Sequence, residues 1–492
     1  MLFKLKQPNN SPLFFLAVSI AVLLSLVSLF FITDNFLILV VLLTPFVVVS
    51  LVVDYRYILY LLLFSLPLSV NLRIDKINLN IDFPSEPCIG LLAIVALIFI
   101  FSQDRKTNIL THVLSKLIFF YWLTLVISFA FSTMPMVSLK TLVVSSSYLL
   151  VFYYLLSYYL INNNWNVKQP FLLYAFSLFG IVLFTIWKHS NYGFNKDYAA
   201  IIVEPFFSDH TIYGACLSFM IPICAILYFR ADKLGVSFFQ KSIVGIFLIF
   251  FLVGVYLSHS RATWISLVSV PVIVLILKFR ISFTSLMSLL SILLLIAFLN
   301  MDALMPLLVK NKNDSKDKRA NLEEQVRSVT NIKNDVSNTE RINRWQCAVR
   351  MFKEKPFTGF GVGTYQFKYI TFQKESEMTV ISVTSAKNNY SQGMGGTAHS
   401  EYLLTLSENG LFSGFALLAI VLYSMYLGMK LYYKGTDDIK YYALMIMLSL
   451  VTYFLHGIFN NFLTTDKAAF LVWGGLAVLC ALDIKYKRNE KV

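Results

Sequence analysis

Long apolar runs separated by short polar turns occupy most of this 492-residue chain. A helix of about 20 apolar residues crosses about 30 Å of hydrocarbon, so each long run predicts a membrane-spanning helix. The first run follows Lys4 and Lys6 as in a signal peptide, but it lacks a small-residue cleavage site and we expect it to be retained. Fourteen runs qualify, the third of them short: 13–32, 36–53, 56–70, 87–102, 110–132, 140–161, 170–188, 208–229, 241–257, 262–278, 281–299, 401–429, 440–460 and 468–484.

One long polar stretch without such a run divides the chain. The pattern therefore predicts four parts. They are about 11 spans over residues 1–299, a large loop over 300–400, about three spans over 401–484, and a short tail over 485–492.

The predicted loop carries one strong helical signal, at 339–354. Its apolar side chains recur at helical spacing, which predicts an amphipathic helix, and Pro356 and Gly359 should end it. The expected apolar stripe consists of Ile342, Trp345, Val349 and Phe352. Farther on, Thr397 and Ser400 predict a capped N-terminus for the spanning helix that follows.

Composition agrees with a membrane protein. Hydrophobic residues make up 57% of the chain and charged residues 14%, whereas a soluble domain is about 25% charged. This balance excludes a soluble enzyme, a disordered scaffold and a small disulfide-linked domain, so we expect an all-α polytopic membrane protein of about 12–14 helices. The cysteines form no CxxC pair, and neither a disulfide framework nor a zinc site is expected: Cys88, Cys216, Cys224, Cys347 and Cys480.

The formal net charge of +14 indicates how the chain is oriented. With the N-terminus in the cytoplasm, about 19 Lys and Arg fall in cytoplasmic turns and tails, against 7 in the short outer turns. Because cytoplasmic loops carry such an excess, both termini should be cytoplasmic and the large loop periplasmic. Anionic membrane lipids are expected partners, and nucleic acid is not.

Three arginines of the expected outer face are candidates for binding an anion. Arg261 lies in a very short turn between two apolar helices, where a desolvated guanidinium needs an anionic partner or extends to lipid head groups. Arg341 and Arg344 lie three residues apart and share one face of the predicted loop helix. That face either binds a ligand or is simply solvated.

Histidines provide the candidate acid–base groups. His399 lies where the polar loop enters a spanning helix, and the positive end of a helix disfavours imidazolium. A neutral imidazole can act as a general base, although position alone favours an interfacial residue that caps the helix. His210 is a second outer-face histidine, and His456 reads best as a core histidine.

Several chemistries have no sequence support. The chain contains no Walker A motif, no HExxH and no EF-hand loop, and the glycine run at Gly359–Gly363 follows a helix, which excludes a dinucleotide fingerprint. The predicted spans contain few charged residues, which disfavours a proton-driven carrier.

Two motifs and a turn carry a resemblance to a known family. R-x-x-x-W followed by P-x-x-G-x-G-x-G begins at Arg341, and A-H-S-x-Y-L-x-x-L-x-E-x-G-L runs from Ala398 to Leu411. With the S-R-A turn at Ser260, their order and spacing resemble the O-antigen ligase and O-antigen polymerase superfamily over about residues 205–480.

The resemblance implies a C-type glycosyltransferase architecture that works without a metal or other cofactor. The donor would be a glycan on undecaprenyl pyrophosphate at the outer leaflet of the bacterial inner membrane. The acceptor would be lipid A–core, another glycan or a protein, and a chain-length regulator protein is a candidate further partner. In this reading His399 is the catalytic base, Arg261 and Arg341 bind pyrophosphate with Arg344 secondary, and the supporting residues are His210, Tyr402 and Glu408.

Residue types alone leave alternatives open. A transporter or flippase of lipid-linked saccharides would share the many helices and the basic outer face, but it needs a polar pathway through the bundle. A structural membrane protein whose loop binds a partner is a third possibility. Within the leading reading, ligase and polymerase use the same motifs, and the sugar is not readable from the sequence.

Overall fold

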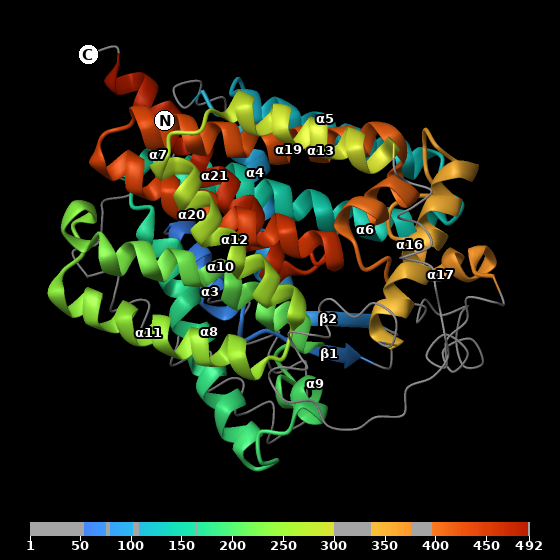
Figure 1. Ribbon diagram of the computed structural model, residues 1–492, viewed down its shortest axis with the longest axis horizontal. Helices are drawn as coiled ribbons and strands as arrows, with labels where there is room; N and C mark the ends of the chain where they lie inside the picture. The colour runs from blue at the N-terminus through green and yellow to red at the C-terminus, as the bar shows by residue number, and fades with distance from the viewer. Residues whose placement is uncertain are drawn as a thin grey trace.

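The computed structural model describes residues 54–74, 79–101, 108–163, 165–299, 336–374 and 396–490. Figure 1 shows a bundle of helices with the C-terminus at one end, and with a short hairpin and the helix α16 at the other. The first two predicted spans and most of the polar stretch before residue 336 lie outside the described residues.

Nine helices within the described residues are long and apolar enough to cross a membrane. They are α5 (Val113–Ala130), a continuous unit of α6 (Pro135–Tyr148), η3 (Leu149–Leu155) and α7 (Leu156–Asn162), α8 (Lys168–Ser190), α10 (His210–Phe229), α11 (Phe238–Leu257), α12 (Arg261–Lys278), α19 (Glu401–Lys434), α20 (Asp437–Phe459) and α21 (Asp466–Asn489). Three shorter apolar helices join them: α3 (Tyr55–Ser65), α4 (Ser85–Phe101) and α13 (Phe283–Leu299).

Each of these helices coincides with one predicted span, so the expected all-α polytopic membrane fold is confirmed. Short elements connect them: β1 (Val70–Ile74), β2 (Leu79–Phe83), η4 (Lys196–Tyr198), α9 (Ala199–Ile202), η5 (Ala231–Leu234), α16 (Val336–Glu354), α17 (Tyr365–Lys368) and η6 (Tyr369–Phe372).

The helix α21 forms the centre of the bundle. Its membrane-length window is entirely buried, while α11 and α12 are mostly exposed on the outside. The ring of Phe470 on α21 contacts three other aromatic rings, with centroids 5.4–5.7 Å apart: Phe152, Phe171 and Tyr174. The abundant Phe and Tyr residues thus form a dense core and also a lipid-facing surface.

Two spans depart from regular α-helix. The η3 segment in the second long span is π-helical, a geometry often found near functional sites. The helix α19 breaks at Gly410, whose φ of 79° is left-handed and favours glycine. Both irregularities lie beside the cavity described below, because Leu149 and Asn409 line it.

The hairpin of β1 and β2 was not predicted. Val70 pairs with Phe83 and Ile74 with Leu79 in an antiparallel register. The sequence did carry the signal, since apolar and polar residues alternate strictly through V-N-L-R-I and L-N-I-D-F.

The predicted loop helix exists as α16, but its buried face differs from the expected stripe. Val349 is 39% exposed, whereas Cys347, Ala348 and Met351 are buried. Polar side chains share this buried face, with Asn343 and Arg344 among them. The expected apolar stripe does not identify the buried face correctly, because α16 also buries an ion pair against the bundle.

Candidate functional site

His399 lies directly before α19, at the end of the bundle where α16 docks. Ser400 is the N-cap, and its hydroxyl accepts a hydrogen bond from the Leu403 amide at 3.5 Å, which confirms the predicted cap. The backbone of His399 is left-handed, with φ of 50°. Such strain costs about 1–3 kcal/mol for a residue with a side chain and clusters at functional sites.

Two distant segments hold His399 in place. The indole nitrogen of Trp345 on α16 donates to the His399 carbonyl oxygen at 3.1 Å. The His399 side chain hydrogen-bonds with Asn460, whose amide nitrogen also lies 3.0 Å from Nε2 of His456. His456 is buried, as a core histidine should be, but through Asn460 it also belongs to the site.

The surroundings of His399 favour the neutral imidazole. Burial, together with the nearby charges of Arg344 and Arg341, lowers the pKa of His399 to about 4, although the Asn460 hydrogen bond and the Asp209 carboxylate act in the opposite direction. The imidazole is therefore neutral at neutral pH, and it can accept a proton.

Asp209 and His210 form an adjacent acidic and basic pair before and at the start of α10. Oδ1 of Asp209 lies 2.7 Å from Nδ1 of His210. Burial raises the pKa of Asp209, but hydrogen bonds from His210 and Thr211 outweigh it and hold this pKa below its usual range. The Asp209 carboxylate acts electrostatically on His399, which places α10 next to the site.

Arg344 is buried and committed to structural contacts. Its Nε donates to Oε1 of Glu340 at 2.9 Å, and its Nη1 donates to the Thr397 carbonyl at 3.0 Å. The guanidinium also lies 5.0 Å from the centroid of the Tyr369 ring. Arg344 therefore fastens the segment that carries His399 onto α16.

The other two predicted arginines lie at the same end of the bundle. Arg341 is half-buried on α16, and its charge acts on both His399 and His456. Arg261 begins α12, on a turn that packs tightly on α10: a Cβ on Gly214 would lie 2.3 Å from Oγ1 of Thr263. The structure thus brings Arg341 to His399 and places Arg261 beside the start of α10.

The glycine run after α16 wraps around the break in α19. The amides of Gly363 and Tyr365 both donate to the Glu408 carboxylate at 2.8 Å. The Gly361 amide donates to the Glu408 carbonyl at 2.9 Å. Glu408 therefore holds this loop in place. The glycine run of the first sequence motif binds Glu408 of the second motif through these backbone amides.

Tyr402 and Glu401 join the first turn of α19 to α20. The Tyr402 hydroxyl donates to the Phe454 carbonyl at 2.9 Å. The buried Glu401 carboxylate accepts hydrogen bonds from the Phe462 and Leu463 amides at 3.0 and 3.3 Å. Glu401 therefore fixes the turn that carries Asn460.

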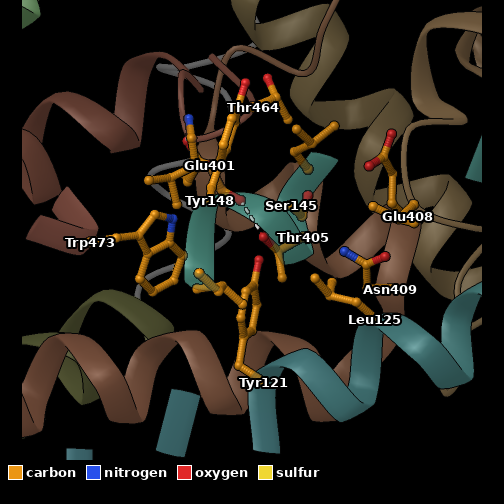
Figure 2. A pocket seen from close by; sticks show the side chains of 14 residues that line it. Tyr121, Leu125, Ser145, Tyr148, Glu401, Thr405, Glu408, Asn409, Thr464 and Trp473 are labelled. Atoms are coloured by element: carbon orange, nitrogen blue, oxygen red, sulfur yellow. Dashed lines mark hydrogen bonds between the residues drawn. The ribbon is translucent and has the colours of Figure 1, made fainter. Parts of the chain in front are cut away.

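A small cavity lined by both polar and apolar side chains lies inside the bundle beside this turn. Figure 2 shows Tyr121 and Thr405 pointing into it, with Glu401 and Asn409 from the same helix at its wall. Oδ1 of Asn409 is buried without a hydrogen-bond partner among the described residues. The cavity measures about 40 Å³, room for one or two water molecules, so it is too small for a sugar.

A larger cavity of about 500 Å³ opens between the hairpin and the segment before α10, a size typical of ligand sites. Three carboxylates line it, those of Asp82, Glu204 and Asp466, together with the rings of Phe206 and Phe207. One wall continues directly into Asp209 and His210.

A buried lysine forms part of the same cavity wall. Lys467 donates to the carbonyl oxygens of Ser69, at 2.8 Å, and Phe206. Its ammonium also lies 4.6 Å from the centroid of the Phe207 ring. Lys467 is held by these contacts, and the buried Asp466 carboxylate accepts hydrogen bonds from the Ser85 hydroxyl and the Lys467 amide. The acidic groups of the open part are therefore Asp82 and Glu204.

Comparison with protein families gives a match over residues 246–419, to the family described as O-antigen ligase. This match agrees with the resemblance to the O-antigen ligase and polymerase superfamily that the sequence motifs predict. No curated protein matches the chain. The similarity and the apolar helices support a multi-pass membrane protein that acts, in general terms, in glycosyl transfer from a lipid-linked glycan to an acceptor.

The O-antigen ligase match covers only part of the candidate site. Arg261, Arg341, Arg344 and His399 fall within it, as do Tyr402 and Glu408. His210 falls outside it, as do Asp209 and Asn460, which act on the same histidine, and His456, which hydrogen-bonds with Asn460. Sequence reasoning missed Asn460 and Glu340, although each lies four residues from its partner and on the same helix face or turn.

Metal ligation has no support among the described residues, where no group of three His, Cys, Asp or Glu side chains is placed to hold a metal ion. The five cysteines form no disulfide, and all of them are buried.

Proposed function

We propose that the protein is an inverting glycosyltransferase of the O-antigen ligase or polymerase type. The donor is a glycan on undecaprenyl pyrophosphate, and the acceptor is a sugar hydroxyl at the outer leaflet of the bacterial inner membrane. One observation carries this proposal: a neutral, strained His399 lies next to arginine charges at a single end of the membrane bundle.

The chemical step needs one base and one leaving group. His399 accepts the proton of the acceptor hydroxyl, and the hydroxyl oxygen forms a bond to the anomeric carbon. The bond from that carbon to the phosphate oxygen breaks from the opposite face, and the pyrophosphate leaves with the electron pair. Attack opposite the leaving group inverts the anomeric centre.

The leaving pyrophosphate requires fixed positive charge, which arginine forks supply well. Arg341 is the best placed cation because its charge already acts on His399. Arg261 is the second candidate, at the start of α12. Arg344 contributes by position, since its hydrogen bonds to Glu340 and Thr397 fix the two segments that carry Arg341 and His399.

The carboxylate-lined cavity is suited to the acceptor. Carboxylates accept hydrogen bonds from sugar hydroxyls and repel a pyrophosphate, while aromatic faces such as Phe206 pack on sugar rings. Because the wall of this cavity leads into Asp209 beside His399, an acceptor bound there approaches the base from the side of α10.

The orientation follows from the lysine and arginine asymmetry, with both termini in the cytoplasm and α16 in the periplasm. The acceptor is lipid A–core, another glycan chain or a protein, and the residues of the site do not distinguish these.

A reconstituted assay tests the proposal. The purified full chain in lipid nanodiscs receives a polyprenyl-pyrophosphate glycan and a soluble acceptor glycan, and mass spectrometry detects the joined product. We expect transfer by the wild type, none by His399→Asn, and normal transfer by the exposed control Lys353→Ala on α16. Donor movement between leaflets without any product would contradict the proposal and favour a carrier.

A further inference from the structure

A groove with basic residues at its mouth lies at the end of the bundle opposite His399, between the last turns of α19 and the start of α13. It encloses about 500 Å³, which is the size of a ligand site. Arg280, Lys430 and Lys434 line it, and none of the described residues that line it is Asp or Glu.

The groove changes from basic to apolar along its length. Lys434 ends α19, whereas Tyr426 lies eight residues earlier and about 12 Å deeper along the helix axis. Phe283 begins α13, and its ring contacts that of Tyr426 at 5.6 Å between centroids. Cations therefore mark the end of the helices, and aromatic side chains line the deeper part.

The groove also opens toward the lipid. On α13, Leu289 is 55% exposed and Ile292 is 54% exposed, as expected for a helix surface in contact with acyl chains. Of the cations in the groove, Lys430 forms an ion pair with Asp483 at 3.0 Å. The side chains of Arg280 and Lys434 are exposed and supply most of the positive charge at the mouth.

We propose that this groove binds one anionic phospholipid. The phosphate lies between Arg280 and Lys434, and the first carbons of an acyl chain lie along Phe283 and Tyr426. The groove matches such a lipid in two ways: its cations match the charge of the head group, and its change from basic to apolar follows the change from head group to acyl chain. Basic pockets between membrane helices recognise anionic head groups. This lipid site lies between α13 and α19, apart from the candidate site for glycosyl transfer.

Native mass spectrometry of the purified full chain tests the site. The protein is equilibrated in mixed micelles with equal amounts of phosphatidylglycerol and phosphatidylcholine, which differ chiefly in headgroup charge. We expect wild type to retain one phosphatidylglycerol preferentially. Each cation near the surface contributes about a fivefold change in affinity, so Arg280→Ala with Lys434→Ala should reduce retention roughly 25-fold.

Matched controls separate the groove from general surface charge. Lys116→Ala with Lys241→Ala removes the same number of positive charges outside the groove and should leave retention unchanged. Lys434→Gln alone, at an exposed side chain, should give an intermediate loss if the double variant folds poorly. Equal retention of both lipids would overturn the proposal, as would equal losses in the groove and control variants. Displacement of the lipid by millimolar inorganic phosphate would show a phosphate site instead.

Discussion

His399 is the residue whose chemistry depends most on its neighbours. Its position before a helix was readable from the sequence, because a capping serine and an apolar run follow it. The groups that set its charge come from α16, from the turn before α10 and from the end of α20. No local sequence pattern connects these segments. The sequence therefore predicted a neutral imidazole only from the position of His399 at the positive end of a helix.

The pH dependence of transfer tests His399 as a base. Since its pKa is lowered to about 4, the wild-type rate should stay level from pH 8 to about pH 5.5 and fall as the pH drops toward 4, because imidazolium cannot accept a proton. His399→Asn tolerates the left-handed backbone but has no basic nitrogen, and it should lose about 10²–10⁴ in rate. A wild-type rate that rises on acidification would show that the histidine acts as a cation.

Substitution of Arg344 should lower the stability of the protein, whereas substitution of Arg341 should weaken donor binding. Arg344→Ala removes one side of the buried ion pair with Glu340, which costs about 3–5 kcal/mol of stability. Arg341→Lys should keep the melting temperature but weaken donor binding, because a point charge replaces a fork. Thermal unfolding beside donor titration separates the two effects. Normal donor affinity in Arg341→Lys would remove that residue from the pyrophosphate site.

Glu204 tests the assignment of the acceptor cavity. Glu204→Gln should raise the KM for acceptor about tenfold, the loss of one hydrogen bond to a charged group, with the KM for donor unchanged. Asp197→Asn, an exposed carboxylate in η4 outside the cavity, is the matched control. If wild type transfers glycan and Glu204→Gln has an unchanged acceptor KM, the acceptor binds elsewhere.

At the level of elements, the apolar runs predicted the spans well, whereas the irregular segments were predicted poorly. Apolar runs predict membrane helices because the bilayer imposes one length and one polarity on all of them. The β1–β2 hairpin and the buried face of α16 depend on contacts with other parts of the chain. The glycine run was excluded as a nucleotide loop, but its partner, the break at Gly410, lies almost 50 residues later.

Two glycines of this interaction should be irreplaceable. A Cβ on Gly359 would lie 2.1 Å from the Glu408 carbonyl oxygen, and one on Gly410 would lie 2.2 Å from the Phe357 carbonyl oxygen. Both residues have positive φ, so alanine should cost about 2–5 kcal/mol at each. Gly180→Ala, in a regular part of α8 with open space around it, should be neutral or slightly stabilising, as melting temperatures would record. Equal stability in all three variants would contradict the loop-to-helix interaction.

At the scale of the whole molecule, the prediction that matters most is orientation. Cysteines introduced at Lys368, near the His399 end, and at Lys434, near the opposite end, should react differently with an impermeant maleimide in intact spheroplasts. We expect labelling at 368 only, and the native cysteines should stay silent because all five are buried. Labelling at 434 alone would place the site on the cytoplasmic side, away from an outer-leaflet donor.

The contacts of His399 also bear on how this protein could be divided or recombined. The segment that matches the O-antigen ligase family ends at residue 419, but Asn460, which bonds the histidine side chain, lies on the far side of another complete membrane crossing. Asp209 lies before the matched segment begins. A chimera that received only the matched segment would therefore gain the histidine without the groups that tune it, so a transferred segment must extend at least from Asp209 to Asn460.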